Sequence, residues 1–271
     1  MDREENTQLL RQVLGSVASQ MRGSMGNIHA ALRQLKMPDL PQSNEEEKRN
    51  AILIQSYYRL LRLMNNMTVA AELDGERVPL DPESDIVLWL EELIHQAKPL
   101  AEEQGLTLTF RCQEEYHLVF MNRRLMERLV WNLLSNAMKF TSPGGRIDVS
   151  LDFRDGQVLL TVADNGCGIS AEMMDIVYER YLHPERLDPL PHGLGLGLPL
   201  CRRIAEGHGG RFLLTSREGE GTTVTVSLPD DSPQGELKEP ITVSDGGFQQ
   251  VMVELSDALS YRVFTRRNLD D

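Results

Sequence analysis

Residues 191–200 read Pro191-His192-Gly193-Leu194-Gly195-Leu196-Gly197-Leu198-Pro199-Leu200. Glycines alternate with leucines and lead into apolar residues at helical spacing, which predicts a loop followed directly by a helix. Glycine permits positive φ and close approach of a ligand, and a helix start presents free N–H groups and a positive dipole end. This combination is typical of a phosphate-binding loop, although a plain glycine turn can have the same composition.

The overall composition is that of a folded globular protein with one or two domains. The 271 residues are 41% hydrophobic and 25% charged, which are ordinary proportions. The net charge of −13 argues against a general binder of nucleic acid or anionic membranes, because such proteins need a basic surface. The three cysteines have neither disulfide nor zinc spacing. Without a long apolar run or a signal peptide, we expect a cytoplasmic protein with no membrane segment.

Two long helices are predicted within the first 74 residues. Apolar residues recur every three or four positions over residues 6–36 and again over residues 44–73, and two prolines separate the two patterns. The second helix carries one apolar row of Leu53, Tyr57, Leu60, Met64, Met67 and Ala71, and a neighbouring row of Ile54, Tyr58 and Leu61. A hairpin buries one row, so the other predicts either a homodimeric four-helix bundle or packing on the chain's own downstream domain.

Strand and helix patterns follow after residue 74 in the order of an α+β sandwich. The predicted elements are a short edge strand at 78–82, a helix over 85–104, strands at 106–110 and 118–120, a helix over 122–140, and strands at 146–153 and 157–163. The last two strands flank Asp155-Gly156, which is a hairpin signal. We expect helices on one face of a mixed sheet.

Three places in this region carry residues suited to a ligand. Asn132, Asn136 and Lys139 share one face of the predicted helix because they are four and three residues apart. Two amides and an ammonium group suit a hydrated Mg²⁺ ion and phosphate oxygens. Asp164 follows a predicted strand, and its carboxylate can accept a hydrogen bond from an amine such as that of adenine. Each place also has an ordinary interpretation as a surface or a turn, but their combination with the glycine stretch favours a nucleotide site.

These motifs resemble the ATP-binding fold shared by gyrase, heat-shock chaperones of that class, MutL and the sensor histidine kinases. Residues 132–139 are similar to the asparagine box of that fold, and Asp164-x-Gly166-x-Gly168 and Gly193-x-Gly195-x-Gly197 are similar to its two glycine boxes. The histidine kinases are the most similar of these families, since residues 178–181 resemble their aromatic box and residues 209–229 resemble the end of their catalytic domain.

The resemblance implies three segments. Residues 1–74 would be a helical hairpin for dimerisation that is similar to a phosphotransfer domain, and residues 75–230 would be an α/β sandwich that binds ATP. Residues 231–271 would be a C-terminal extension without a family motif. Residues 241–243 and 248–255 have strand-like patterns, and the apolar content of the segment favours an extension that is partly ordered and packs on another part of the chain over a disordered acidic tail.

The resemblance also implies roles for individual residues. Asn136 would bind Mg²⁺ with Asn132 nearby, and Lys139 would contact phosphate. Asp164 would bind the adenine amine, and the other residues implied to bind nucleotide are Gly166, Gly168, Tyr178, Gly193, Leu194, Gly195, Gly197 and, at the adenine end, Thr223. The ATP-hydrolysing members of the superfamily carry a glutamate where this chain has Asn132, so rapid hydrolysis is not expected.

The first helix departs from the family at the phosphoryl acceptor. Alignment on Arg22 places Ser19 where histidine kinases carry the acceptor histidine, and Gln20 where they carry an acidic base. A serine hydroxyl needs a base to act as a nucleophile at neutral pH, and a glutamine cannot be that base. We therefore expect phosphorylation on histidine by the usual route to be lost, with His29 as the alternative acceptor within the hairpin.

Three functions are compatible with the sequence. The first is a degenerate, dimeric, histidine-kinase-like regulator that binds ATP and acts on a response regulator or another signalling protein. The second is an active kinase that phosphorylates Ser19, His29 or a serine on a partner protein. The third is a nucleotide-gated scaffold without catalysis.

Overall fold

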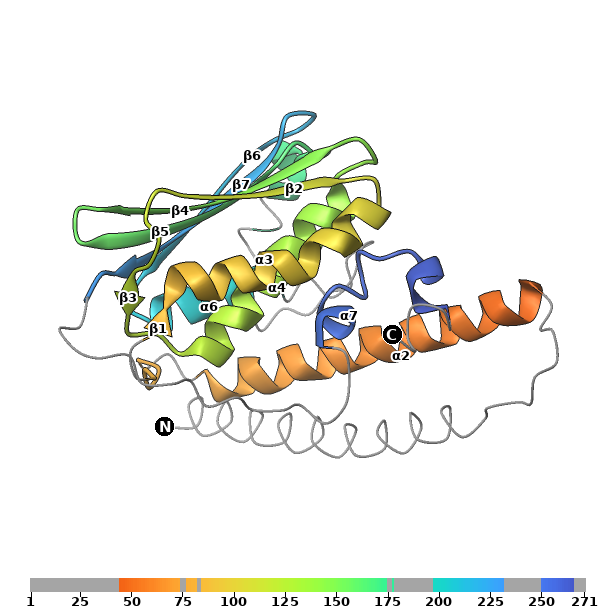
Figure 1. Cartoon of the computed structure of the whole chain (residues 1–271), viewed down its shortest axis with the longest axis horizontal. Helices are drawn as coiled ribbons and strands as arrows, with labels where there is room; N and C mark the ends of the chain where they lie inside the picture. Colours follow the sequence, from red (N-terminus) through yellow and green to blue (C-terminus); the bar gives the residue numbers. More distant parts are fainter. Residues whose placement is uncertain are drawn as a thin grey trace. The chain divides into compact units, whose positions relative to one another are not determined.

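The computed structural model describes residues 44–73, 77–81, 84–174, 177, 197–231 and 250–265. The chain divides into two compact units, one made of residues 1–74 with 248–271 and the other of residues 75–247 (Figure 1). Several residues named above lie outside the described residues: Ser19, Gln20, His29, Tyr178, Gly193, Leu194 and Gly195. The predicted first helix and the strand predicted at residues 241–243 lie outside them as well.

A mixed five-stranded sheet forms the core of the second unit. Its strands in spatial order are β2 (Thr107–Cys112), β4 (Arg146–Arg154), β5 (Gln157–Asp164), β7 (Gly221–Pro229) and β6 (Arg211–Arg217). Strands β2 and β4 run parallel, and the other neighbours pair antiparallel. A separate antiparallel ladder joins β1 (Ser84–Asp85) to β3 (Leu118–Val119).

Three helices cover one face of this sheet (Figure 1). They are α3 (Ile86–Glu103), α4 (Arg123–Phe140) and α6 (Gly197–Gly207). Every second residue along the central strands is apolar and buried: Ile147, Val149, Leu151, Val158, Leu160, Val162, Val224, Val226 and Leu228. These side chains form the core under the helices, and the alternate residues lie on the outer face. The expected α+β sandwich is confirmed.

The β4–β5 hairpin turns where the sequence predicts. Asp155 and Gly156 have φ values of +54° and +67°, which is the pair of positive angles that a tight two-residue hairpin needs.

The predicted edge strand at residues 78–82 is wrong over the described residues 78–81. The backbone there bonds to helix ends instead: Val78 N–H donates to Gly207 O at 2.9 Å, and Asp81 N–H donates to Met121 O at 3.1 Å. Pro79 has no N–H to donate, and its carbonyl accepts a bond from Asn122 Nδ2 at 2.9 Å. This segment therefore fastens the start of α4 and the end of α6 rather than extending a sheet.

The described part of the first unit is helical. Helix α2 (Asn44–Glu72) confirms the second predicted helix, and α7 (Gln250–Glu254) and the 3₁₀ helix η1 (Tyr261–Phe264) pack on it. The strand predicted over residues 248–255 is wrong over residues 250–254. Residues 255–260 form the turns between α7 and η1, and Leu255, Leu259 and Val263 are buried.

Polar side chains of α2 bind the free carbonyl groups that follow α7. Gln55 Nε2 donates to Leu259 O at 2.6 Å and to Ser256 O at 3.3 Å, and Arg59 Nε donates to Ser256 O at 3.1 Å. Carbonyl groups at a helix end lack partners within the helix. Since α2 supplies these partners, residues 250–265 are an integral part of the first unit.

An aromatic contact changes the interpretation of the second apolar row of α2. The rings of Tyr58 and Phe264 meet edge to face with centroids 5.6 Å apart. Tyr58 therefore has a partner within its own chain, which the pattern assigned either to a second copy or to the downstream domain. None of the helices in the described ranges has both the length and the apolar character needed to cross a membrane.

Candidate functional site

The two asparagines of α4 lie beside the first residue of α6. Asn132 is fully buried, and its Nδ2 donates to Arg128 O at 2.9 Å. Asn136, one turn later, is half-buried. A Cβ atom added to Gly197 would lie 3.4 Å from Asn132 Oδ1 and 3.8 Å from Asn136 Nδ2. The end of the glycine stretch and the asparagine box therefore meet, and a side chain at position 197 would fill the space between them.

The C-terminal end of α4 supports the loop after β5. Cys167 N–H donates to Phe140 O at 3.0 Å, and a Cβ atom on Gly166 would clash with the same carbonyl. Lys139, in the last turn of α4, is half-buried, with its Nζ 5.6 Å from the centroid of the Phe140 ring. Because glycine has no Cβ, the loop can lie directly on the helix end next to this lysine.

Asp164 holds the base of this loop with one carboxylate oxygen. Its Oδ1 accepts bonds from Gly166 N–H at 2.9 Å and Thr222 N–H at 3.3 Å, while its Oδ2 accepts none from the described residues. Burial raises the pKa of Asp164, although the two N–H donors act to lower it. Oδ2 is therefore an acceptor that remains for a ligand.

Thr222, and not Thr223, lies beside Asp164. The two residues are opposite each other in the β5–β7 ladder, so their side chains share a face of the sheet. Side chains alternate between the two faces of the sheet along β7, and Val224 is buried on the inner face, so Thr223 and Thr225 lie on the outer face. There Thr225 Oγ1 and Thr161 Oγ1 form a hydrogen bond of 3.1 Å. The sequence therefore held a signal, in strand parity, that the family resemblance alone did not use.

Ser216 was also missed by the sequence analysis. Its Oγ accepts a bond from Ile169 N–H at 3.0 Å and lies 2.9 Å from Gly221 O and 2.8 Å from Thr222 Oγ1. This hydroxyl joins the loop after β5 to the β6–β7 hairpin.

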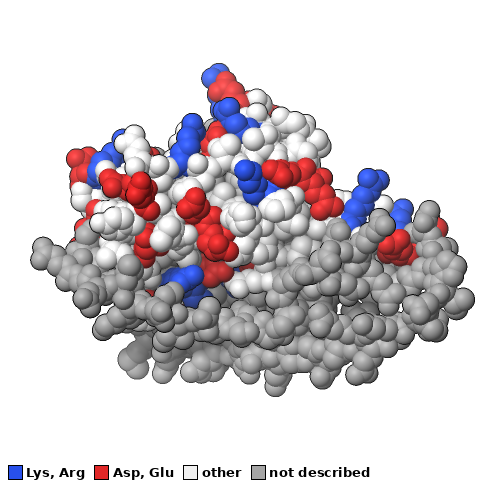
Figure 2. Space-filling model, viewed as in Figure 1, with Lys and Arg blue, Asp and Glu red and all other residues white. Residues whose placement is uncertain are grey.

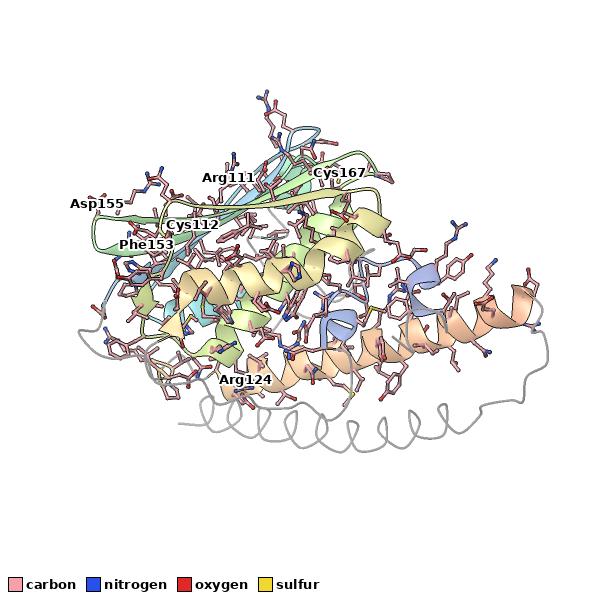
Figure 3. All side chains as sticks on the ribbon, viewed as in Figure 1. Arg111, Cys112, Arg124, Phe153, Asp155 and Cys167 are labelled. Carbon is pink, nitrogen blue, oxygen red and sulfur yellow. The ribbon has the colours of Figure 1, made fainter. Side chains whose placement is uncertain are left out.

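Two glycines allow these segments to approach. Gly168 and Gly221 have φ values of +64° and +104°, and a Cβ on either would clash with a backbone carbonyl, of Arg217 and Asp164 respectively. Figure 3 places Cys167, in this loop, at one end of the sheet and Phe153 and Asp155 at the other. The candidate site thus lies at the end of the sheet opposite the β4–β5 turn.

Charge on the visible face is mixed. Figure 2 shows acidic and basic side chains interspersed over the described residues of that face. Elsewhere in the same unit charges also pair with each other, such as Arg146 with Asp148 at 2.7 Å. No group of three or more His, Cys, Asp or Glu residues among the described ranges is placed to hold a metal ion. Among the described residues, local N–H groups and Lys139 are suited to hold an anion, and the amide oxygens of Asn132 and Asn136 are suited to a cation.

The structure brings together the described residues of all three predicted motifs. Asn132 and Asn136 meet Gly197, the end of α4 meets Gly166, and Gly168 lies against the β6–β7 hairpin. Asp164 is joined to this group through Gly166 and Thr222.

Comparison with known proteins agrees with this arrangement. Residues 121–232 match the family described as "Histidine kinase-, DNA gyrase B-, and HSP90-like ATPase". The chain is 28% identical over 247 residues to "Histidine kinase P4" of Formosa agariphila, covering 89% of this chain and 18% of that protein. It is also 28% identical over 233 residues to "Sensor protein SrrB" of Staphylococcus aureus, covering 84% of this chain and 40% of that protein. The chain therefore spans less than half the length of these relatives.

Solved structures share the fold. One, "Crystal structure of ShkA full-length in complex with AMPPNP", has a TM-score of 0.63 and 22% identity, and covers 80% of this chain and 45% of its own. Another, "Acinetobacter baumannii histidine kinase AdeS", has a TM-score of 0.50 and 15% identity, and covers 79% and 98% of the two chains.

Proposed function

We infer that residues 121–232 are a histidine kinase-, DNA gyrase B- and HSP90-like ATPase domain in a homologue of sensor histidine kinases. From this premise we propose that this chain is an ATP-binding signalling protein. The proposed protein regulates a partner and does not phosphorylate itself on histidine by the usual route. The observation that supports it most is the meeting of Asn132 and Asn136 with Gly197, at the start of α6.

Adenine is proposed to bind at the Asp164 end of the site. Asp164 Oδ2 would accept a hydrogen bond from the amine of the base, since Oδ1 already binds Gly166 and Thr222. Gly166 and Gly168 let the loop after β5 pack against Phe140 O and Arg217 O beside this end. Thr222 takes the role that the resemblance assigned to Thr223.

The triphosphate is proposed to bind at the Asn136 end. The first N–H groups of α6 and the ammonium of Lys139 would bind phosphate oxygens. Mg²⁺ fits the donor set, because it is commonly held by one or two protein oxygens together with phosphates and water. Asn136 would supply such an oxygen, and the bound ion would neutralise phosphate charge.

Phosphotransfer is proposed to be impaired. Ser19 and Gln20 stand in the acceptor and base positions, and neither forms the histidine–acid pair of the family. Asn132 is a hydrogen-bond donor and acceptor but not a base, so ATP hydrolysis is proposed to be slow. An active kinase that uses Ser19, His29 or a partner's serine, and a scaffold without catalysis, are the alternatives.

A homodimer through the helical hairpin is proposed, with a response regulator or another signalling protein as partner. In the structure of one chain, two neighbouring apolar side chains of α2 are exposed to solvent: Ile52, with an exposed fraction of 43%, and Leu53, with 51%. Leu53 begins the first apolar row, so this end of α2 offers a surface that a second copy can cover.

Incubation of the full chain with γ-³²P-ATP and Mg²⁺ tests this function. The proposal predicts retention of ATP without covalent label on the protein. Acid-stable label that is lost in Ser19→Ala would support the kinase alternative, and label only on an added partner would support transfer in trans. Acid-labile label that is lost in His29→Gln would show an active histidine kinase and contradict the proposal.

A further inference from the structure

The hydroxyl group of Ser216 has three neighbours and a limited set of hydrogen bonds. A serine oxygen has one hydrogen and two lone pairs. Ile169 N–H donates to it at 3.0 Å, Gly221 O lies at 2.9 Å, and Thr222 Oγ1 lies at 2.8 Å. A carbonyl oxygen can only accept, so Ser216 must give its single hydrogen to Gly221 for that contact to be a hydrogen bond.

This leaves one possible direction for the remaining contact. With its hydrogen on Gly221 O and one lone pair on Ile169 N–H, Ser216 Oγ can only accept from Thr222. Thr222 must therefore donate its hydroxyl hydrogen to Ser216, and this is its single side-chain bond among the described residues. The lone pairs of Thr222 Oγ1 remain available, so this hydroxyl is an acceptor toward any ligand.

Thr222 then forms one acceptor pair with its cross-strand neighbour. Asp164 is directly opposite in the ladder and also has an available oxygen, Oδ2. Two neighbouring acceptors favour an amino group, which presents N–H donors, and disfavour a keto oxygen, which is itself an acceptor. The selectivity depends on Ser216, because a threonine hydroxyl that is not held can rotate and become a donor.

We propose that Ser216 is a positioning residue that sets base selectivity, by fixing the proton of Thr222 so that the site prefers a 6-amino purine over a 6-oxo purine. This inference rests on the proposed ATP site. The proposed role changes the ratio of the affinities for two nucleotides. A purely structural role in holding the loop after β5 would instead lower the affinity for every nucleotide equally.

The test compares affinities of the full chain for ATP and inosine triphosphate, with Mg²⁺, by titration calorimetry. Ser216→Ala is expected to lower the ATP-to-inosine-triphosphate affinity ratio about three- to tenfold, the size of one neutral hydrogen bond. Ser216→Thr keeps the hydroxyl and is expected to keep the ratio. Ser227→Ala, on the outer face of β7, is the matched control and leaves the ratio unchanged.

Other outcomes separate this inference from the proposed function. A wild-type ratio near one, or an equal loss of affinity for both nucleotides in Ser216→Ala, overturns the role of Ser216 while ATP binding stands. No binding of either nucleotide to the wild type overturns both. If Ser216→Ala does not fold, Thr222→Val removes the acceptor with Ser216 intact and is expected to lower the same ratio; an unchanged ratio contradicts the inference.

Discussion

At Asp164 the proposed ligand binding and the stability of the ligand-free protein make opposite demands. Its Oδ1 is used by two backbone N–H groups, and burial raises the pKa of the carboxyl group. A folded-state pKa above the unfolded value means that this group favours folding fully at pH below the unfolded pKa, and that this contribution is lost as pH rises through the folded pKa. At neutral pH the ionised carboxylate is therefore a cost to the ligand-free protein.

Asp164→Asn is accordingly expected to leave the ligand-free protein at least as stable at pH 7.5. The asparagine Oδ1 can accept the same two bonds without a buried charge, so the free energy of unfolding should be unchanged or raised by up to about 1 kcal/mol. Urea denaturation measures this. The control Asp148→Asn loses ion pairs with Arg111 and Arg146 and should show no gain; a clear loss of stability in Asp164→Asn would contradict the account.

His208 is expected to make the second unit sensitive to acid. This buried imidazole donates from Nδ1 to Ile204 O at 2.7 Å and accepts Asn122 N–H at Nε2, 3.0 Å away. Burial lowers its pKa from the ordinary value of 6.5. The lowered pKa gives stability that is fully present above the unfolded pKa and is lost as pH falls through the folded pKa.

His208→Asn should therefore weaken the protein at pH 7.5 and also reduce its pH dependence. The lost bond to Asn122 is expected to cost about 1 to 2 kcal/mol, and the decrease in stability between pH 7.5 and 5.0 should be smaller than in the wild type. Urea denaturation at both pH values measures this, with the exposed His95→Asn as control. Identical pH profiles for His208→Asn and wild type would rule out this role.

At the scale of single residues, local spacing predicted more of the candidate site than did pairing across the sheet. The asparagine face and the Asp164 loop follow from spacings of three and four residues and from a strand end, which are short-range features. The positions of Thr222 and Ser216 in the candidate site depend on how strands pair between segments about 50 residues apart. The sequence reports this pairing only through the alternation of buried valines along each strand. The resemblance alone led to Thr223, one residue away and on the other face.

At the scale of elements, length and capping decided which predictions held. Helices α3 and α4 are long, periodic and capped by Asp85 and Asn122, and both were predicted. The five residues of α7 are too few to separate a helix from a strand by periodicity. Their helical form depends on α2, since Gln55 and Arg59 bind the carbonyls that follow α7.

The ion pairs of Asp257 measure how firmly this C-terminal segment is held. Arg62, with a side chain 6% exposed, bonds Asp257 at 3.0 Å, while Arg59, 45% exposed, lies 3.5 Å from it. Because the Asp257 side chain is itself 42% exposed, alanine double-mutant cycles should give a coupling of about 1 kcal/mol for Arg62–Asp257 and a smaller one, below about 0.5 kcal/mol, for Arg59–Asp257. Hydrogen exchange of α2 amides reports the opening free energy, and equal couplings would contradict the difference in burial between the two arginines.

At the scale of the whole molecule, the two units differ in how far the sequence could define them. The second unit is nearly continuous in the chain, and its order of elements predicted the sandwich. The first unit joins α2 to residues about 200 positions later, and no local pattern reports such a contact. The pairing of Tyr58 with Phe264 shows why an unfilled apolar row does not by itself require a second copy.

Leu53→Glu tests the proposed homodimer. Light scattering of the wild type should give the mass of two chains, and a buried glutamate at this position should give the mass of one, because an unpaired charge in an apolar interface is costly. Leu213→Glu, at a position 62% exposed on β6, should stay dimeric. A wild-type mass of one chain, or a dimer that survives Leu53→Glu, would count against the hairpin interface.

Titration of the full chain with ATP and Mg²⁺ by calorimetry tests the central claim most directly. The account predicts binding of one ATP per chain that weakens at least about tenfold in Asp164→Asn, because the amide presents hydrogens to the adenine amine where Oδ2 accepted one. Asp148→Asn should bind as the wild type does. Absence of binding, or equal affinity in Asp164→Asn and wild type, would contradict an ATP site at these residues.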